Sequence, residues 1–133
     1  MDIVKQLALF LANRPGALGD ICDELAKAKI NIYALTVGDT VDHSVIRMVV
    51  NDTPRALRVL TERGVLVVEN EVLMIENNNK PGSLSRIARV LATHRINIEY
   101  AYLATVPNAK RGLLILRVDH TRKALDILSQ GAF

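Results

Sequence analysis

One hexapeptide occurs twice in the chain, first as Asn13-Arg14-Pro15-Gly16-Ala17-Leu18 and again as Asn79-Lys80-Pro81-Gly82-Ser83-Leu84. The tripeptide Ile-Asn-Ile also recurs, at residues 30–32 and 96–98, with the same offset of 66 residues. Ten of the twenty positions in 13–32 are identical to their counterparts in 79–98. A repeat of this length exceeds the units of the common solenoid proteins, so the sequence predicts two copies of one small domain.

Each copy begins with the same hydrophobic pattern. The apolar run at 5–12 predicts a strand that ends in the Asn-Arg-Pro-Gly turn. Apolar residues then recur with the spacing i, i+3, i+4, i+7 and i+8, which places them on one face of a helix. They are Leu18, Ile21, Cys22, Leu25 and Ala26 in the first copy, and Leu84, Ile87, Ala88, Leu91 and Ala92 in the second. Pro15 and Pro81 lie where a helix start tolerates proline.

A pair of strands is expected after this helix. The first runs from Ile30 to about Val37, and the second covers the β-rich run at 45–50. Gly38-Asp39 and Asp42-His43 supply turn residues between them.

The first copy then closes with a helix and a strand. Asp52-Thr53-Pro54 predicts a helix start, with Asp or Thr as the cap and Pro in the first turn. A fourth strand follows at 65–68. The predicted class is therefore α+β, with two ferredoxin-like βαββαβ domains in tandem over residues 1–70 and 71–133.

The second copy departs from the first in two places. Ala56-Leu57 matches Ala124-Leu125 at an offset of 68, which implies two extra residues, expected in the turn around 107–110. After the last helix, over about 122–129, only Gly131-Ala132-Phe133 remain. Because these are too few for a fourth strand, the strand at 72–76 should have an open edge unless another segment or chain covers it.

Composition disfavours several classes of protein. The 133 residues are 50% hydrophobic and 23% charged, as is typical of globular domains. The net charge of +3 comes from scattered basic residues and does not predict a nucleic-acid-binding surface. The apolar run at 7–12 is too short for a membrane span or a signal peptide. With a single cysteine, Cys22, we expect no internal disulfide and a cytoplasmic protein.

Catalytic and cofactor sites are not predicted. His43, His94 and His120 are isolated from one another and from Cys22, so no metal-ligand spacing occurs. No phosphate-binding or dinucleotide-binding loop is present, and no nucleophile has an evident partner base. RNA-recognition modules of this topology stack bases on aromatic residues of the central strands, and the run at 45–50 has none. We therefore expect neither an enzyme nor a cofactor.

The repeated motif suits a small zwitterionic ligand. Main-chain N–H groups at a helix start attract a carboxylate, and Gly16 and Gly82 allow its close approach. Asparagine offers two donors and an acceptor, which suits a ligand with both an ammonium and a carboxylate. Asn13 and Asn31 bracket the first helix and are expected to act at one place. Asparagine is also a common turn residue, so a purely structural role remains open.

The sequence Asn/Lys-Pro-Gly-x-Leu, an amphipathic helix and Ile-Asn-Ile together resemble the ACT domain in both copies. The resemblance implies a regulatory module that binds an amino acid at an interface between two ACT units lying side by side in one sheet. It also implies a homodimer and, as a partner, an enzyme of amino-acid metabolism. Related domains have a polar residue two places before the first asparagine, where this chain has Leu11 in the first copy and Asn77 in the second.

The same resemblance assigns the ligand contacts to the two asparagines of each copy. The predicted ligand-binding residues are Asn13, Arg14, Pro15, Gly16, Ala17, Leu18 and Asn31, with Asn79, Lys80, Pro81, Gly82, Ser83, Leu84 and Asn97 in the second copy. A second hypothesis is a docking module that regulates a metabolic enzyme without a ligand of its own.

Overall fold

The computed structural model describes residues 1–39 and 43–133. Ten elements follow one another along the chain: β1 (Asp2–Ala12), α1 (Ala17–Lys27), β2 (Ile32–Asp39), β3 (His43–Val50), α2 (Thr53–Glu62), β4 (Leu66–Asn78), α3 (Ser83–Thr93), β5 (Ile98–Ala104), β6 (Arg111–Val118) and α4 (Thr121–Leu128). The α+β class is confirmed, and so is the ferredoxin-like order of the elements.

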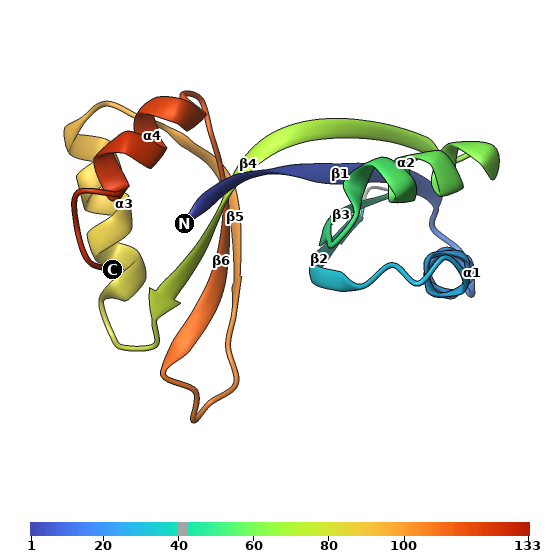
Figure 1. Cartoon of the computed structure of the whole chain (residues 1–133), viewed down its shortest axis with the longest axis horizontal. Helices are drawn as coiled ribbons and strands as arrows, with labels where there is room; N and C mark the ends of the chain where they lie inside the picture. The colour runs from blue at the N-terminus through green and yellow to red at the C-terminus, as the bar shows by residue number, and fades with distance from the viewer. Residues whose placement is uncertain (40–42) are drawn as a thin grey trace. The chain divides into compact units, whose positions relative to one another are not determined.

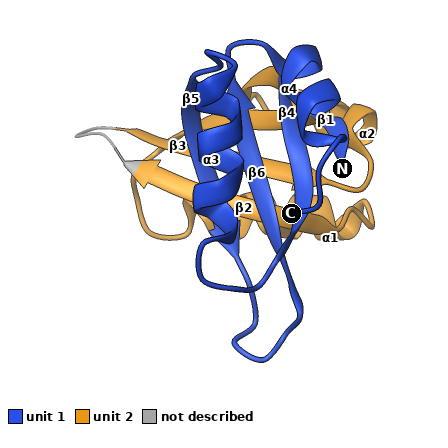
Figure 2. Ribbon diagram, turned by 90° about the vertical axis from the view of Figure 1, so that its left-hand side faces the viewer, with its two compact units in different colours: residues 1–4, 71–133 blue, residues 5–70 orange. Residues whose placement is uncertain are grey.

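Two compact units divide the chain (Figure 2). Residues 5–70 form one unit, which holds the first copy of the motif. Residues 1–4 and 71–133 form the other, which holds the second copy. The first residues of β1 therefore belong to the second copy, although they lie at the opposite end of the sequence from the rest of it.

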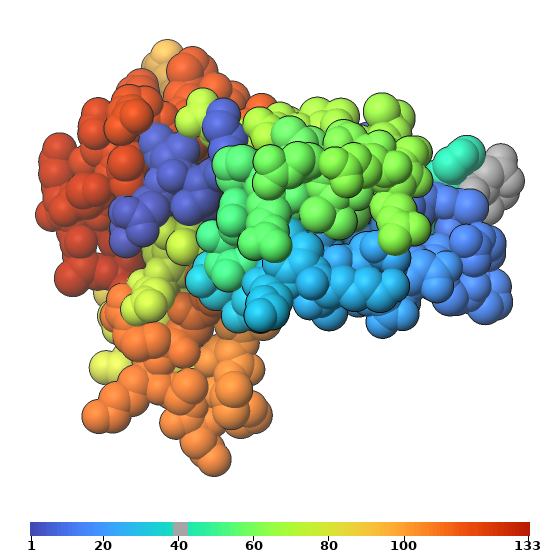
Figure 3. Space-filling view, turned by 45° about the vertical axis from the view of Figure 1, so that its right-hand side comes forward, coloured from blue at the N-terminus to red at the C-terminus, as the bar shows by residue number. Residues whose placement is uncertain are grey.

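The first copy has the strand order β2-β3-β1-β4. Leu7 lies opposite Met48 and Leu9 opposite Ile46, and all four side chains are buried. Ile21 and Leu25 of α1 and Ala56 and Leu60 of α2 complete the same hydrophobic core. The two helices lie side by side on the surface of this unit, α1 in blue and α2 in green (Figure 3).

In the second copy, β4 lies between β6 and the start of β1, and β5 forms the far edge. Helices α3 and α4 cover one face of these strands (Figure 1). Their residues Ile87, Leu91, Ala124 and Leu128 share a core with buried leucines and isoleucines of β4 and β6. Ile3 packs against this core, so residues of β1 cover the strand edge that the sequence left open.

Several predicted boundaries were wrong. The strands expected at 65–68 and 72–76 are one continuous strand, β4, because the segment 65–78 contains neither Gly nor Pro to interrupt it. Gly38 and Asp39 extend β2 and His43 begins β3, where turn residues were expected. Asp42 lies outside the described residues. The predicted turn at 107–110 does lie between β5 and β6, where the Ala109 N–H donates to Val106 O at 2.9 Å.

The helix caps follow the local chemistry. Asp52 caps α2 by accepting a 3.2 Å hydrogen bond from the Arg55 N–H, as predicted, and Pro54 lies in the first turn. Gly16 and Gly82 are the N-caps of α1 and α3, with φ of +86° and +88°. This left-handed conformation favours glycine, which explains why both copies have one there.

Candidate functional site

Both motif loops turn sharply into the start of a helix. In the first copy the Asp20 N–H donates to Gly16 O, and in the second the Arg86 N–H donates to Gly82 O, each at 2.9 Å. The first N–H groups of a helix have no partner within it, and the helix dipole makes this end positive. The Ala17 and Ser83 N–H groups donate within their loops, to Arg14 O and Lys80 O, and the N–H groups that follow them favour a carboxylate.

Four predicted residues of the first copy line one small pocket of about 130 Å³. Asn13, Arg14, Ala17 and Leu18 form its loop and helix side. Val37, Ser44 and Ile46 line it from β2 and β3, and Leu11 and Ala12 from β1. Pro15 and Gly16 lie in the same exposed loop but do not line the pocket.

Asn31 is not brought to this pocket. Helix α1 has 11 residues and is about 16 Å long, which places Asn13 and Asn31 at its opposite ends. The Asn31 N–H donates to Asn51 Oδ1 at 2.9 Å, and the Asn51 N–H donates back to Asn31 O at 3.0 Å. In the second copy Asn97 and Asp119 repeat this pairing. Asn31 and Asn97 thus have a structural role through their main chain, while both residues stay exposed.

The second copy has a buried amide beneath its motif loop. Asn77 is only 3% exposed. Its Nδ2 donates to Asn78 O at 3.2 Å and to the hydroxyl of Ser83 at 3.4 Å. Its Oδ1 is buried and has no hydrogen-bond partner among the described residues. A buried acceptor without a donor costs free energy.

The two copies differ in the residue that lies opposite this position in the sheet. Asn77 lies opposite Gly112, whereas Leu11, its counterpart, lies opposite Ser44. A Cβ on Gly112 would lie 3.0 Å from Asn77 Oδ1, so glycine leaves room for the amide. Ser44 is 8% exposed and supplies a polar group from the opposite strand. Sequence reasoning missed Ser44, because its place depends on the pairing of β1 with β3.

Asn79 braces the second motif loop. Its Nδ2 donates to Ala109 O at 2.6 Å, and its N–H donates to Lys110 O at 3.0 Å. Asn78 is held to the same hairpin, because its Oδ1 accepts from Arg111. Asn13 has no corresponding side-chain hydrogen bond within the described part of the chain. The two asparagines of the repeated motif therefore differ in local role.

The remaining predicted residues are exposed or lie at the helix start. Lys80, Pro81, Leu84 and Leu18 are exposed, and Ser83 is buried against Asn77. Among the described residues, no group of three or more His, Cys, Asp or Glu side chains is placed to hold a metal ion. None of the described helices has the length and apolar character needed to span a membrane.

Comparison with solved structures finds several similar chains. Protein BT0572 from Bacteroides thetaiotaomicron has a TM-score of 0.90 and 29% sequence identity, over 96% of this chain and 88% of that one. The ligand-free regulatory subunit of aspartate kinase from Thermus thermophilus has a TM-score of 0.68 at 17% identity, over 98% of this chain and 97% of that one. The corresponding subunit from Thermus flavus has a TM-score of 0.64 at 19% identity, over 97% and 93%.

At these identities the two kinase subunits share the fold with this chain, and the comparison carries no further conclusion. No curated protein matches the sequence. The family model of the ACT domain pair matches residues 1–131, which is nearly the whole chain. Together with the βαββαβ order of the first copy, the βαββα order of the second and their glycine-capped motif loops, this match shows that the chain belongs to the ACT domain family, as a pair of ACT domains.

Proposed function

We propose that the chain is a non-catalytic regulatory module whose motif loops bind an amino acid at interfaces between ACT units. The buried Oδ1 of Asn77 carries the proposal, because this residue of β4 has an acceptor without a donor among the described residues, and its amide contacts Ser83 at the start of α3. A ligand ammonium is a strong donor, and a charge-assisted hydrogen bond would remove the cost of leaving this oxygen unpaired.

The ligand carboxylate has a complementary place at the same loop. The first main-chain N–H groups of α3 follow Gly82, whose lack of a side chain lets an anion approach the backbone. Ser83 adds a hydroxyl that already lies near the Asn77 amide. An α-amino acid presents its ammonium and carboxylate on one carbon, which matches an acceptor and a set of donors within one loop.

Exposed apolar residues favour an interface beside each motif. Leu18 and Val37 line the pocket of the first copy and are exposed, and their counterparts Leu84 and Leu103 are exposed in the second. Val37 and Leu103 belong to the edge strands β2 and β5. Pairing such edges between two chains would cover these side chains and form a homodimer.

An antiparallel pairing of units would also explain how two asparagines at opposite ends of one helix could contact the same kind of ligand. Asn13 and Asn31 lie at opposite ends of α1, so one copy alone cannot bring both to one small ligand. Two units related by a two-fold axis place Asn13 of one beside Asn31 of the other. In this arrangement Asn79 and Asn97 form the equivalent pair, and each ligand is shared between two units.

Thermal melts with each of the twenty amino acids test the proposal. An amino acid that binds only the folded protein, at about 100 times its Kd, adds roughly 2.7 kcal/mol to the free energy of unfolding. We expect one or two amino acids to raise the melting temperature. Asn77→Leu should abolish the response of the second copy, and Asn13→Ala should weaken that of the first. Glu62→Gln, an exposed change in α2 that belongs to neither motif loop, should leave the response intact.

Light scattering during size-exclusion chromatography tests the interface. We expect a dimer that the effective amino acid stabilises against dilution. A flat melting response across all twenty amino acids, with a folded protein, would refute amino-acid binding. The alternative, a docking module for an enzyme of amino-acid metabolism, predicts that flat response.

A further inference from the structure

The first copy contains a second groove, which shares Leu11, Ala12, Arg14 and Ala17 with the motif pocket. It has a volume of about 490 Å³ and lies between α1 and the turn that joins α2 to β4. Leu11, Ile21 and Val65 are its large apolar residues. Its charged residues are Arg14, Lys27, Arg63, Asp20, Asp23 and Glu24. Three cations and three anions therefore surround an apolar surface.

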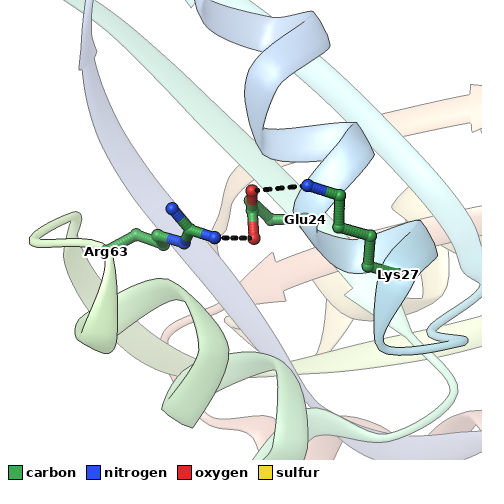
Figure 4. Close-up of polar contacts among 3 residues, drawn as sticks. All are labelled: Glu24, Lys27 and Arg63. Atoms are coloured by element: carbon green, nitrogen blue, oxygen red, sulfur yellow. Dashed lines mark hydrogen bonds and ion pairs between the residues drawn. The ribbon is translucent and has the colours of Figure 1, made fainter.

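Glu24 is the central charge of this groove (Figure 4). Arg63 Nη2 lies 2.7 Å from one carboxylate oxygen of Glu24, and Lys27 Nζ lies 3.5 Å from the other. The Glu24 side chain is 19% exposed, whereas those of Lys27 and Arg63 are mostly exposed. At the other end, Arg14 and Asp20 form a longer contact of 3.7 Å between exposed side chains. Long contacts between exposed charges are weak, so these groups can exchange partners readily.

The second copy has different residues at the corresponding place. Phe133 is the counterpart of Val65 at the offset of 68 residues, and it packs against the core of its own copy. Arg86, the counterpart of Asp20, lies 5.4 Å from the centroid of the Phe133 ring and donates to Ala132 O at 2.9 Å. Val90 and Thr93 stand where the first copy has Glu24 and Lys27. The ion pairs that Glu24 makes with Lys27 and Arg63 therefore have no counterpart at the matching positions of the second copy.

We propose that the groove of the first copy binds an amino acid with an aliphatic side chain, at a site centred on Glu24 and Arg63 that neither Asn13 nor Asn31 lines. The charges of the groove balance, so its field selects neither a free anion nor a free cation. A zwitterion can pair with both kinds of group at once, since its carboxylate contacts Arg63 or Arg14 and its ammonium contacts Glu24 or Asp20. Each ion pair within the protein is then exchanged for one with the ligand, without a change in net charge.

The apolar part of the groove determines which ligand side chain it prefers. Leu11, Ile21 and Val65 offer carbon surface, and burying an aliphatic side chain there gains about 25 cal/mol per Å² of apolar area. Arg14 and Ala17 are shared with the first motif loop, whereas Glu24, Arg63 and Val65 line the groove and not the motif pocket.

Three related probes test the need for a zwitterion. L-Leucine carries both charges, N-acetyl-L-leucine lacks the ammonium and L-leucinamide lacks the carboxylate. In proton–nitrogen correlation spectra of the labelled full chain, we expect L-leucine to shift amide signals at 20–27 and 63–65 with saturation. The other two compounds should bind about tenfold more weakly or worse, because each loses a charge-assisted hydrogen bond. Equal binding of all three would overturn the proposal.

Variants locate the site. Glu24→Gln and Arg63→Gln should each weaken L-leucine binding in the groove about tenfold, whereas Glu62→Gln, outside the groove, should not. Val65→Phe removes no charge and copies the residue of the second copy, so it should fill the groove and abolish these shifts in a folded protein. Asn79→Ala and Asn77→Leu should leave them unchanged. Shifts that persist in Val65→Phe, or their absence in the wild type, would refute the site whatever the motif loops bind.

Discussion

The main-chain N–H of Asn31 donates to Oδ1 of Asn51 at 2.9 Å, and the Asn51 N–H donates back to the carbonyl of Asn31 at 3.0 Å. This reciprocal pair ties the start of β2 to the end of β3, twenty residues along the chain. In the second copy Asn97 and Asp119 form the same pair at 3.1 and 3.2 Å. A duplicated contact of this kind identifies a structural element common to both copies.

Replacing Asn51 should measure how much this contact contributes to the free energy of unfolding. Asn51→Ala removes the acceptor and is expected to lower the free energy of unfolding by about 1 kcal/mol, the usual net value of one hydrogen bond. Urea denaturation followed by circular dichroism gives this value. Asn51→Asp, which copies the second copy, keeps an acceptor and should cost much less. An equal loss in both variants would show that the acceptor does not matter.

Asp119 should make stability depend on acidity. Its hydrogen bond with His120, together with the one from the Asn97 N–H, holds the pKa of its carboxyl below the ordinary value. A carboxyl with a depressed pKa in the folded state stabilises the protein above its ordinary pKa, about 3.9. That contribution is lost as the pH falls through the lower folded value. We expect Asp119→Asn to reduce the loss of melting temperature between about pH 5 and pH 2. An unchanged acid profile would contradict the assignment.

Gly82 should be needed for its backbone conformation alone. Its φ is +88°, and no atom lies within 4 Å of the place that a Cβ would take. Gly82→Ala is therefore expected to cost about 1–2 kcal/mol of stability through left-handed strain. Gly19→Ala, inside α1 with equally open surroundings, should instead stabilise by up to about 1 kcal/mol. A lower melting temperature for Gly82→Ala and a higher one for Gly19→Ala would show that backbone conformation, and not packing, requires glycine at position 82.

At the other end of α1, Lys29 has a positive φ without being glycine, so here glycine should be the stabilising residue. It has φ of +58°, and the following Ile30 N–H reaches back to Leu25 O at 2.9 Å, as in a helix end that usually has glycine. Lys29→Gly should therefore raise the free energy of unfolding by about 0.5–1 kcal/mol. Arg95 has the same φ in the second copy and should respond in the same direction. Destabilisation by both glycines would refute this explanation.

Asn77 should lower the free energy of unfolding of the ligand-free protein. Asn77→Leu, which copies Leu11, removes a buried oxygen that lacks a donor and is expected to raise the free energy of unfolding by about 1 kcal/mol or more. Calorimetry of the ligand-free protein measures this gain. If the variant is instead less stable, Asn77 is a structural residue and the main support for the second motif site is lost.

Local pattern predicted much of this fold. The repeated Pro-Gly turns, the helical spacing beginning at Leu18 and Leu84, and the cap at Asp52 all depend on neighbouring residues, and the structure confirms them. The continuity of β4 was missed, because short apolar runs separated by polar residues look like two strands. The cover that Ile3 gives to the second core was also missed, since it joins residues far apart in the sequence.

The candidate site was less predictable than the fold. The motif located Asn13, Gly16, Asn79 and Gly82, but it could not distinguish an exposed amide from one that braces a hairpin. Asn79 is bound to Ala109 O, a group supplied by the turn that only the second copy lengthens. Ser44 enters the first pocket through strand pairing, and Glu24 and Arg63 meet across 39 positions of sequence. Such contacts depend on tertiary structure and leave no periodic signal.

The division of β1 between the two copies imposes an order on synthesis. Residues 5–70 are contiguous, so the first copy has all its strands soon after residue 70 leaves the ribosome. The second copy cannot be completed without residues 1–4, which are synthesised before residues 71–133. We expect the early copy to hold β1 in place as a template on which the later copy forms. A chain severed between Asn70 and Glu71 would leave the later half with a bare strand edge, open to self-association.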